Sequence, residues 1–175
     1  VDLKAFTEEF YRKQCAAHLE PVLDTLRFLV HETHVWTEIT TLLIPGANDS
    51  DEELDALSRW IHDELSPDVP LHFTAFHPDF RLDDRGPTPP GTLVRARQIA
   101  MSNGLRYVYT GNVIDGERGS TWCSSCGELL IERSGYRLGR WHLDGNRCRS
   151  CGHAVPGVFD SGPGSGGGRI RPVRF

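Results

Sequence analysis

Four β-rich stretches recur about every 35 residues through the amino-terminal part of the chain, and this spacing constrains the fold more than any other feature. They read VDLKAF, HVWTEITTLLIPG, VPLHFTAF and LRYVYTGNV. Helical patterns fill the gaps, and strands that alternate with helices predict a parallel sheet joined by right-handed crossovers. The run ITTLLI is almost entirely apolar or β-branched, which is typical of a strand buried on both faces. We therefore expect an α/β protein.

The helices are expected from the signals at their ends. Thr7 is a predicted N-cap, and Glu20-Pro21 begins a separate helix because proline suits a first turn. Asp49 or Ser50 caps the next helix, whose acidic first turn suits the positive end of a helix. A further helix is expected from about residue 90 to residue 102, where an Asn-Gly pair follows.

Two architectures fit this alternation of strands and helices. One is a four-stranded doubly wound domain. The other is the second half of a (β/α) barrel over residues 1–116, because four strands and three crossovers make half of such a barrel. We favour the half barrel, since VDLKAF has no turn before it and would otherwise be an unpaired sheet edge. Half a barrel should not be stable alone, so we expect the missing amino-terminal half as a partner.

Polar residues gather where the predicted strands end, and the carboxyl ends of parallel strands are where α/β proteins place functional groups. Asp2 and Lys4 are two residues apart, so their side chains share one face of a strand. That pairing indicates either a structural ion pair or a ligand site. His77 directly follows an apolar strand and is either a ligand contact or a structural histidine.

The strongest local motif consists of Cys123 and Cys126, then 21 residues, then Cys148 and Cys151. This spacing is typical of a zinc site, and a glycine follows each pair, as a tight turn at the metal requires. Four thiolates saturate a tetrahedral ion, so the site is expected to be structural. Rubredoxin-like iron fits the same ligands, and a pair of disulfides is the alternative. We expect a zinc ribbon over residues 117–159 and a flexible Gly-, Ser- and Pro-rich tail over residues 160–175.

Six blocks of the sequence resemble successive blocks of the radical S-adenosylmethionine enzyme of the AmmeMemoRadiSam system. They are VDLKAF, TEITTLLIPGANDSDEEL, FTAFHPDF, GLRYVYTGNV, CSSCGELLIERSGY and CRSCGHAVPGVF. That family is similar to the glycyl-radical activases, such as pyruvate formate-lyase activating enzyme. The resemblance implies a radical-SAM partial (β/α) barrel, S-adenosylmethionine and a 4Fe–4S cluster as cofactors, and two companion proteins encoded nearby as partners.

The resemblance also implies roles for individual residues. Lys4 would contact S-adenosylmethionine, and Asp2 would help to bind a monovalent cation beside it. His77 matches a histidine that also reaches S-adenosylmethionine, and Thr40 and Leu42 match positions that line the cofactor site. The activases carry an arginine where this chain has Thr40, so the chain departs from their pattern there.

A larger departure concerns the cluster itself. The three-cysteine motif of the family, with spacings of three and two residues, does not occur in this sequence, and neither does the stretch Gly-Gly-Glu that holds the methionyl group. Without three thiolates there are no ligands for an open-iron 4Fe–4S cluster, so this chain alone is expected to be inactive. VDLKAF would then be the fourth strand of a barrel whose first half lies upstream.

Charge and hydropathy bear on the partner, the cellular location and the function class of the protein. The net charge is −9 up to Gly116 and +4 after it, and so acidic a body argues against nucleic acid as the main partner. No apolar run approaches the length of a membrane span and no leader precedes Val1, so a cytoplasmic protein is expected. The alternative to an enzyme is a zinc-ribbon binding module on an α/β scaffold, whose arginines contact protein or nucleic acid. We favour the enzyme because the resembling blocks occur in order.

Overall fold

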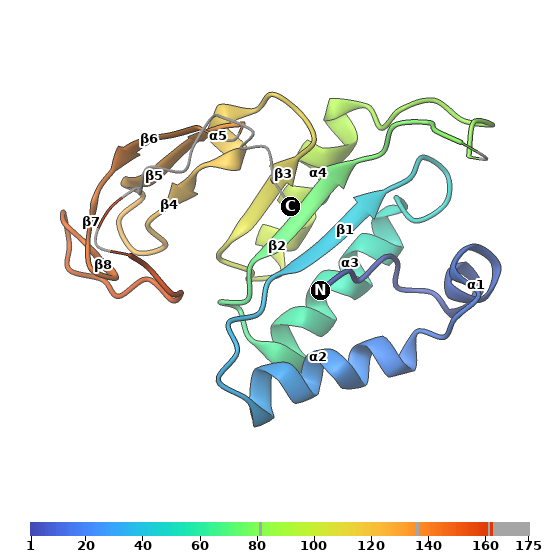
Figure 1. Cartoon of the computed structure of the whole chain (residues 1–175), viewed down its shortest axis with the longest axis horizontal. Helices are drawn as coiled ribbons and strands as arrows, with labels where there is room; N and C mark the ends of the chain where they lie inside the picture. Colours follow the sequence, from blue (N-terminus) through green and yellow to red (C-terminus); the bar gives the residue numbers. More distant parts are fainter. Residues whose placement is uncertain (81, 136, 161, 163–175) are drawn as a thin grey trace, which may run out of the picture. The chain divides into compact units, whose positions relative to one another are not determined.

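The chain forms two compact units in the computed structural model, which describes residues 1–80, 82–135, 137–160 and 162. The units are Val1–Val113 and Ile114–Phe175 (Figure 1). The first is built from helices and a parallel sheet, and the second from short antiparallel strands, so the prediction of a mixed α/β protein is confirmed. The predicted tail of residues 160–175 lies outside the described residues, apart from Asp160 and Gly162.

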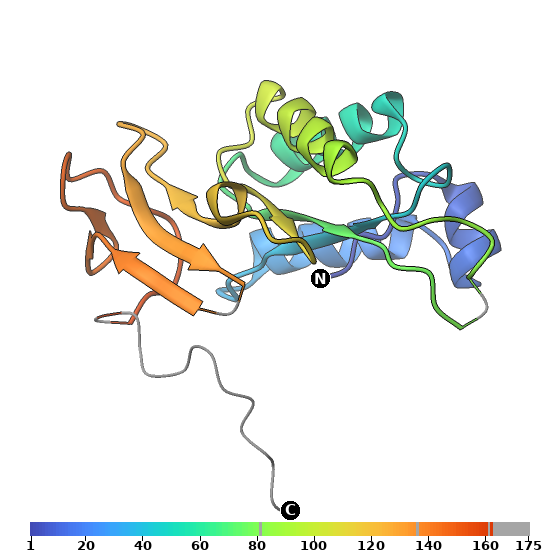
Figure 2. The same cartoon turned by 90° about the horizontal axis from the view of Figure 1, so that it is seen from above.

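The sheet of the first unit follows the order of the chain. Its parallel strands are β1 (Ile39–Leu43), β2 (Leu71–Ala75) and β3 (Val108–Gly111), in the order β1-β2-β3. Thr40 lies opposite His72 in the register, and His72 lies opposite Tyr109. The two crossover helices α3 (Asp51–Trp60) and α4 (Pro90–Ser102) lie on the same side of the sheet (Figure 2). This is the winding that successive right-handed crossovers produce when each strand is added on the same side of the last.

The stretch VDLKAF pairs with the sheet at one position only. Asp2 forms a parallel bridge to Thr40, with hydrogen bonds from Leu3 N to Thr40 O (3.0 Å) and from Thr40 N to Val1 O (2.9 Å). The expectation of a full fourth strand is therefore wrong. Side chains take the acceptors of the next rung, because Thr41 Oγ1 donates to Leu3 O (2.8 Å) and Asn48 Nδ2 donates to Leu42 O (2.9 Å).

The helices begin where their end signals predict. Besides α3 and α4 the unit contains α1 (Glu8–Phe10), the π-turns η1 (Tyr11–Cys15) and η2 (Ile61–Leu65), and α2 (Glu20–Glu32). Thr7 caps α1, and its Oγ1 accepts a hydrogen bond from Phe10 N (3.4 Å). Ser50 caps α3, because its Oγ accepts from Glu53 N (3.2 Å), whereas the Asp49 carboxylate accepts from Gly46 N (2.7 Å) in the preceding turn.

The main core lies on one face of the sheet. Along β1 the side chains of Ile39, Thr41 and Leu43 are buried, whereas those of Thr40 and Leu42 are half-buried, so the expectation that this strand is buried on both faces is wrong. Strands β2 and β3 alternate in the same way. The buried side chains form one cluster with apolar residues of α2, α3 and α4. On the other face Leu42 packs against a second, smaller cluster of Ala5, Phe10, Tyr11, Ile44 and Phe76.

The second unit has little apolar material of its own. It contains α5 (Gly116–Gly119), β4 (Thr121–Trp122), β5 (Leu129–Ser134), β6 (Arg137–Trp141), β7 (Leu143–Asp144) and β8 (Arg147–Cys148). The strands form an antiparallel sheet in the order β4-β5-β6 and an antiparallel pair of β7 with β8. Apart from two cysteines, its buried apolar side chains are Leu130, Ile131, Leu143 and Val155. So few cannot stabilise a domain by themselves, and a bound metal is the usual remedy.

Candidate functional site

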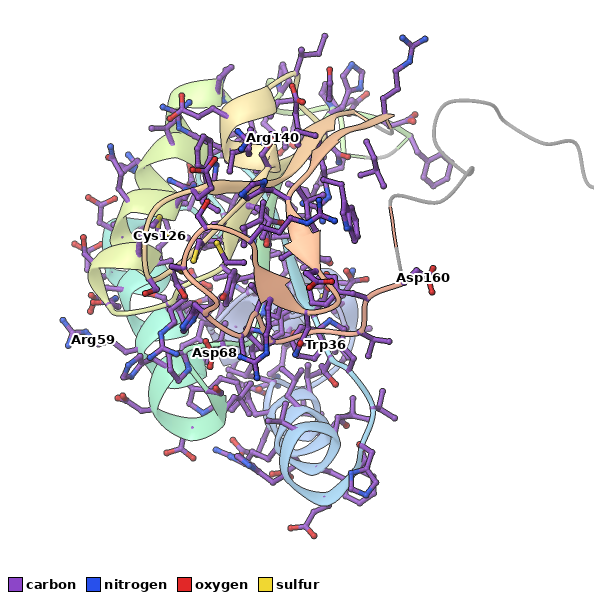
Figure 3. All side chains as sticks on the ribbon, turned by 90° about the vertical axis from the view of Figure 1, so that its left-hand side faces the viewer. Trp36, Arg59, Asp68, Cys126, Arg140 and Asp160 are labelled. Carbon is purple, nitrogen blue, oxygen red and sulfur yellow. The ribbon has the colours of Figure 1, made fainter. Side chains whose placement is uncertain are left out.

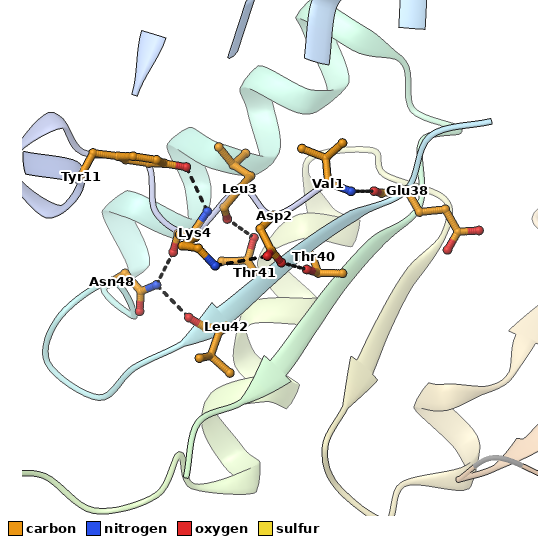
Figure 4. A network of polar contacts seen from close by, with 10 residues as sticks. All are labelled: Val1, Asp2, Leu3, Lys4, Tyr11, Glu38, Thr40, Thr41, Leu42 and Asn48. Atoms are coloured by element: carbon orange, nitrogen blue, oxygen red, sulfur yellow. Dashed lines mark hydrogen bonds and ion pairs between the residues drawn. The ribbon is translucent and has the colours of Figure 1, made fainter. Parts of the chain in front are cut away.

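The half-exposed face of the sheet carries a charged network at its edge (Figure 4). The Asp2 carboxylate accepts hydrogen bonds from the Thr40 hydroxyl and from Lys4 Nζ, the latter at 3.2 Å. The Thr40 hydroxyl and then the Lys4 ammonium lower the pKa of Asp2, against the effect of partial burial. The carboxylate therefore stays ionised to lower pH than an ordinary aspartate, and it presents oxygen atoms beside an ammonium group.

Asn48 fixes the backbone that presents this network. Its Nδ2 donates to Lys4 O (2.6 Å) and to Leu42 O (2.9 Å), and its Oδ1 accepts from Ile44 N (2.7 Å). The residue is only 2% exposed. One side chain thus joins the amino-terminal segment to β1 and to the loop after it. No local signal points to this role, because an asparagine after a Pro-Gly pair is most simply a turn residue.

Four of the five residues assigned to S-adenosylmethionine or its cation lie on the same face of the first unit. Asp2 and Thr40 are partners across the parallel bridge, and Lys4 and Leu42 follow two residues later on the same sides of their segments. His77 is exposed two residues beyond the end of β2 and is not joined to this hydrogen-bonded network. The arrangement can bind a polar ligand across the edge of the sheet.

Glu53 ties the amino-terminal segment to α3. It is the third residue of that helix, where a glutamate usually returns to the backbone of the N-cap residue. Here its Oε1 accepts instead from Phe6 N (2.6 Å). Burial raises the pKa of Glu53, and the hydrogen bond from Phe6 only partly opposes this effect. The protonated form of Glu53 is therefore more favoured in the fold than it is in an exposed glutamate.

We expect Glu53→Gln to gain stability relative to the wild type as the pH rises. Because the pKa of Glu53 is higher in the folded chain than in the unfolded one, the wild type loses stability when the pH rises through the folded pKa. The amide can still accept from Phe6 but does not ionise. Urea unfolding at pH 4 and pH 7 measures the difference, with Glu52→Gln on the exposed side of α3 as the control. An equal difference at both pH values would contradict the assignment.

Four cysteines meet in the second unit. The sulfur atoms of Cys123, Cys126, Cys148 and Cys151 all lie within 4.8 Å of one another. Figure 3 shows sulfur atoms gathered beside the labelled Cys126. The Sγ atoms of Cys123 and Cys151 are 3.7 Å apart, and those of Cys126 and Cys148 are 3.8 Å apart. Ligands placed about 2.3 Å from a tetrahedral ion would be roughly 3.8 Å apart, so the cluster has the dimensions of a metal site for an ion such as Zn or Fe.

Two equivalent turns present these thiols. Gly127 N donates to Cys123 O (2.9 Å), and Gly152 N donates to Cys148 O (2.8 Å). Both glycines have positive φ, 74° and 73°, which residues with a side chain seldom adopt. The first cysteine of each pair is buried and the second is exposed. The predicted glycine turns are therefore confirmed.

All five cysteines carry free thiols, so the disulfide alternative is not adopted in this structure. Cys15 lies apart in η1 and is half-buried. Within the cluster, a backbone N–H of Glu128 lowers the pKa of Cys126, but the neighbouring thiols, Cys151 foremost, raise it to about 12 overall. Burial raises the pKa of Cys148, but N–H groups of Cys151 and Ser150 outweigh it and lower that pKa to about 7. A cation held by the four thiols would displace their protons.

We expect zinc binding to weaken steeply as the pH falls below about 7, because the thiols must lose their protons to bind the metal. With several protons released per ion, the apparent affinity should fall by roughly two orders of magnitude or more per pH unit. A competition titration with a chromophoric zinc chelator between pH 5 and pH 8 measures this dependence. An affinity that does not change with pH would show that thiols are not the ligands.

Comparison with known proteins gives a relative but no function. No family model matches the chain. The chain is 43% identical over 157 residues to a protein of Methanocaldococcus jannaschii that is named only as uncharacterized. The matched region covers 89% of this chain and 46% of that protein, so the chain spans about half the length of the curated relative it matches. Among the described residues, no helix combines the length and apolar character that crossing a membrane requires.

Proposed function

We propose that this chain is the carboxyl-terminal part of a radical S-adenosylmethionine enzyme similar to that of the AmmeMemoRadiSam system. When complete, the enzyme would cleave S-adenosylmethionine reductively and abstract a hydrogen atom from a substrate. The first unit would be half of the partial (β/α) barrel, and the second a zinc ribbon. The observation that carries the proposal is that Asp2, Lys4, Thr40 and Leu42 share one polar face of a parallel sheet.

The winding of the first unit supports a barrel over a doubly wound domain. In a doubly wound sheet helices lie on both faces, whereas in a (β/α) barrel they lie on the outer face only. Here the strand order is sequential and one core cluster joins the sheet to α2, α3 and α4. The opposite face, which would line the interior of a barrel, carries Thr40, His72, Thr74 and Tyr109, all half-buried.

The chain's cysteines do not fit a 4Fe–4S cluster of this family. Such a cluster needs three thiolates that leave one iron open, whereas four of the five cysteines here form a closed set and Cys15 lies apart. The cluster would therefore be bound by residues outside this chain. The part of a longer protein that corresponds to the unmatched half of the archaeal relative would supply them.

The face does suit S-adenosylmethionine and a cation beside it. The Asp2 carboxylate and the Thr40 hydroxyl offer the oxygen ligands that a monovalent cation prefers, and Lys4 Nζ lies next to them. Lys4 would hold S-adenosylmethionine at this end of the sheet, and Leu42 would contact its apolar parts. In the complete enzyme, two companion proteins are the proposed partners.

The zinc ribbon would be structural. Four thiolates fill the tetrahedral coordination sphere of zinc, which leaves no position for a substrate. An alternative role as a nucleic-acid module would rely on its arginines, but several are already bonded within the unit. Arg140 pairs with Glu128 (2.8 Å), and Arg149 donates to Leu143 O (2.9 Å).

The proposal is tested first by reading the genomic DNA directly upstream of the Val1 codon in the same frame. A three-cysteine motif with spacings of three and two residues would support it. A stop codon followed by a valid start near Val1 would overturn it for this gene product.

A binding measurement tests the assigned face itself. Calorimetric titration of the chain with S-adenosylmethionine should give saturable binding that Lys4→Ala weakens and Lys13→Ala does not. Lys13 is a suitable control because it is also an exposed lysine paired with a carboxylate, that of Glu9, but lies on η1. Equal effects of the two substitutions would contradict the assignment of Lys4.

A further inference from the structure

A second group of interacting side chains lies on the same sheet face, nearer the amino ends of the strands. It has no part in the roles proposed so far. Its centre is Glu38, directly before β1. Trp36 Nε1 donates to Glu38 Oε1 (2.9 Å), and His72 Nε2 lies 2.8 Å from Glu38 Oε2. The His72 ring stacks on Tyr109 with centroids 4.9 Å apart and planes 25° apart. One carboxylate thus lies between the side chains of Trp36 and His72, and the second of these stacks on Tyr109.

The register places this group of side chains beside the proposed cofactor residues. His72 and Tyr109 are in the same row as Asp2 and Thr40 across the sheet. Glu38 precedes Thr40 by two residues, which is about 7 Å along a strand. Figure 4 shows Glu38 at the start of β1, beside Val1. A ligand bound there would lie next to a molecule held by Lys4.

The chemistry of these side chains favours a positively charged ligand. The Glu38 side chain is 46% exposed and that of His72 is 30% exposed, so both can be reached from solvent. A carboxylate attracts positive charge, and the faces of tryptophan and tyrosine rings attract cations through their quadrupoles. An apolar protein surface laid over Glu38 would bury the exposed part of the carboxylate without adding a donor to those of Trp36 and His72. A positively charged group supplies both the charge and the donors.

We propose that Trp36, Glu38, His72 and Tyr109 bind the ammonium group of a small-molecule substrate. The identification of the ligand as a substrate rests on the proposed function, whereas the existence of an ammonium site does not. S-adenosylmethionine also carries an ammonium group, so the two sources share one chemistry. The experiment therefore includes both.

The first measurement uses three small aromatic probes whose head groups are positive, neutral and negative: benzylammonium, benzyl alcohol and benzoate. Each is titrated into the ¹⁵N-labelled chain while the indole N–H signal of Trp36 is followed, after its assignment with Trp36→Phe. Benzylammonium should shift this signal saturably and bind at least about tenfold more tightly than benzyl alcohol. Benzoate should not bind. Equal responses to benzylammonium and benzoate would overturn the proposal.

Matched variants then test whether the Glu38 carboxylate supplies the charge that binds benzylammonium. Glu38→Gln keeps the hydrogen-bond acceptor and removes the charge, so it should weaken benzylammonium binding about tenfold. Glu52→Gln, on the exposed side of α3, should leave it unchanged. Unchanged binding by Glu38→Gln in a chain whose spectrum shows an intact fold would overturn the proposal.

S-adenosylmethionine separates the two possible sources. If it shifts the amides of Lys4 and Leu42 and leaves benzylammonium bound at Trp36, the ammonium site belongs to a second molecule, as proposed. If it displaces benzylammonium from Trp36, the site serves the cofactor and the substrate assignment is overturned. If it does not bind while benzylammonium does, the cofactor part of the proposed function fails and the ammonium site stands.

Discussion

Removal of the metal should unfold the second unit and leave the first one folded. Apparent binding free energies of structural zinc in small domains are about 10–16 kcal/mol near neutral pH, whereas the four buried apolar side chains of the described part of this unit contribute roughly 6–12 kcal/mol, less than the entropy cost of ordering its backbone. With the metal removed, the amide signals of residues 121–135 and 137–155 should collapse to the narrow range of an unfolded chain. The signals of Val1–Val113 should keep their positions, since that unit has a core of its own.

The measurement is a ¹H–¹⁵N spectrum before and after treatment with a zinc chelator, with the metal content followed by mass spectrometry. Cys148→Ser, which removes a buried ligand, should give the chelated spectrum without any chelator. Cys15→Ser removes a thiol outside the cluster and should retain one equivalent of metal. A second unit that keeps its dispersed signals when shown to be metal-free would refute a structural metal.

Asn48→Ala should destabilise the first unit by about 2–4 kcal/mol. The substitution leaves the N–H of Ile44 and the carbonyl groups of Lys4 and Leu42 without their partner in a place that is closed to water. Each buried group that loses its hydrogen bond costs about 1–3 kcal/mol, partly recovered by local relaxation. The same substitution should also weaken the proposed binding of S-adenosylmethionine at Lys4, because the carbonyl group of that residue is no longer tied to the loop after β1.

Urea unfolding followed by circular dichroism at 222 nm measures this change, since nearly all helical residues belong to the first unit. Thr25→Ala is the control. The Thr25 hydroxyl donates to a backbone carbonyl, Pro21 O at 2.7 Å, but from the exposed side of α2. This substitution should change the stability by well under about 1 kcal/mol. Equal effects of the two substitutions would show that Asn48 is only a turn residue.

The features that local chemistry decides could be predicted from the sequence. Ser50 caps α3 because a hydroxyl at that position satisfies an N–H group three residues ahead. Pro21 marks the start of α2, and Pro90 that of α4, because proline fits only the first turn of a helix. The cysteine cluster belongs to the same class, since each pair and its glycine form one tight turn.

The features that depend on residues distant in the sequence could not be predicted from it. Asn48 meets Lys4 from 44 residues away, and no property of the short loop around it foretells that contact. The face of β1 that stays half-exposed carries Thr40 and Leu42, whose residue types also suit a buried strand. The pairing of VDLKAF stops after Leu3 because the side chains of Thr41 and Asn48 bond the carbonyl groups of the next rung, and that competition is decided in three dimensions.

The two matching cysteine turns have a consequence for the order in which the second unit assembles. Each turn is closed by bonds within its own few residues, from Gly127 to Cys123 and from Gly152 to Cys148, so each can form before the other is present. The 21 residues between Cys126 and Cys148 are then the only loop whose ends the metal must bring together. Closing a loop of that size removes chain entropy from the unfolded state on the order of 3 kcal/mol, as a disulfide would. A bound ion would act as a reversible cross-link between two turns that are already formed, and the concentration of available metal would set how much of the second unit is folded.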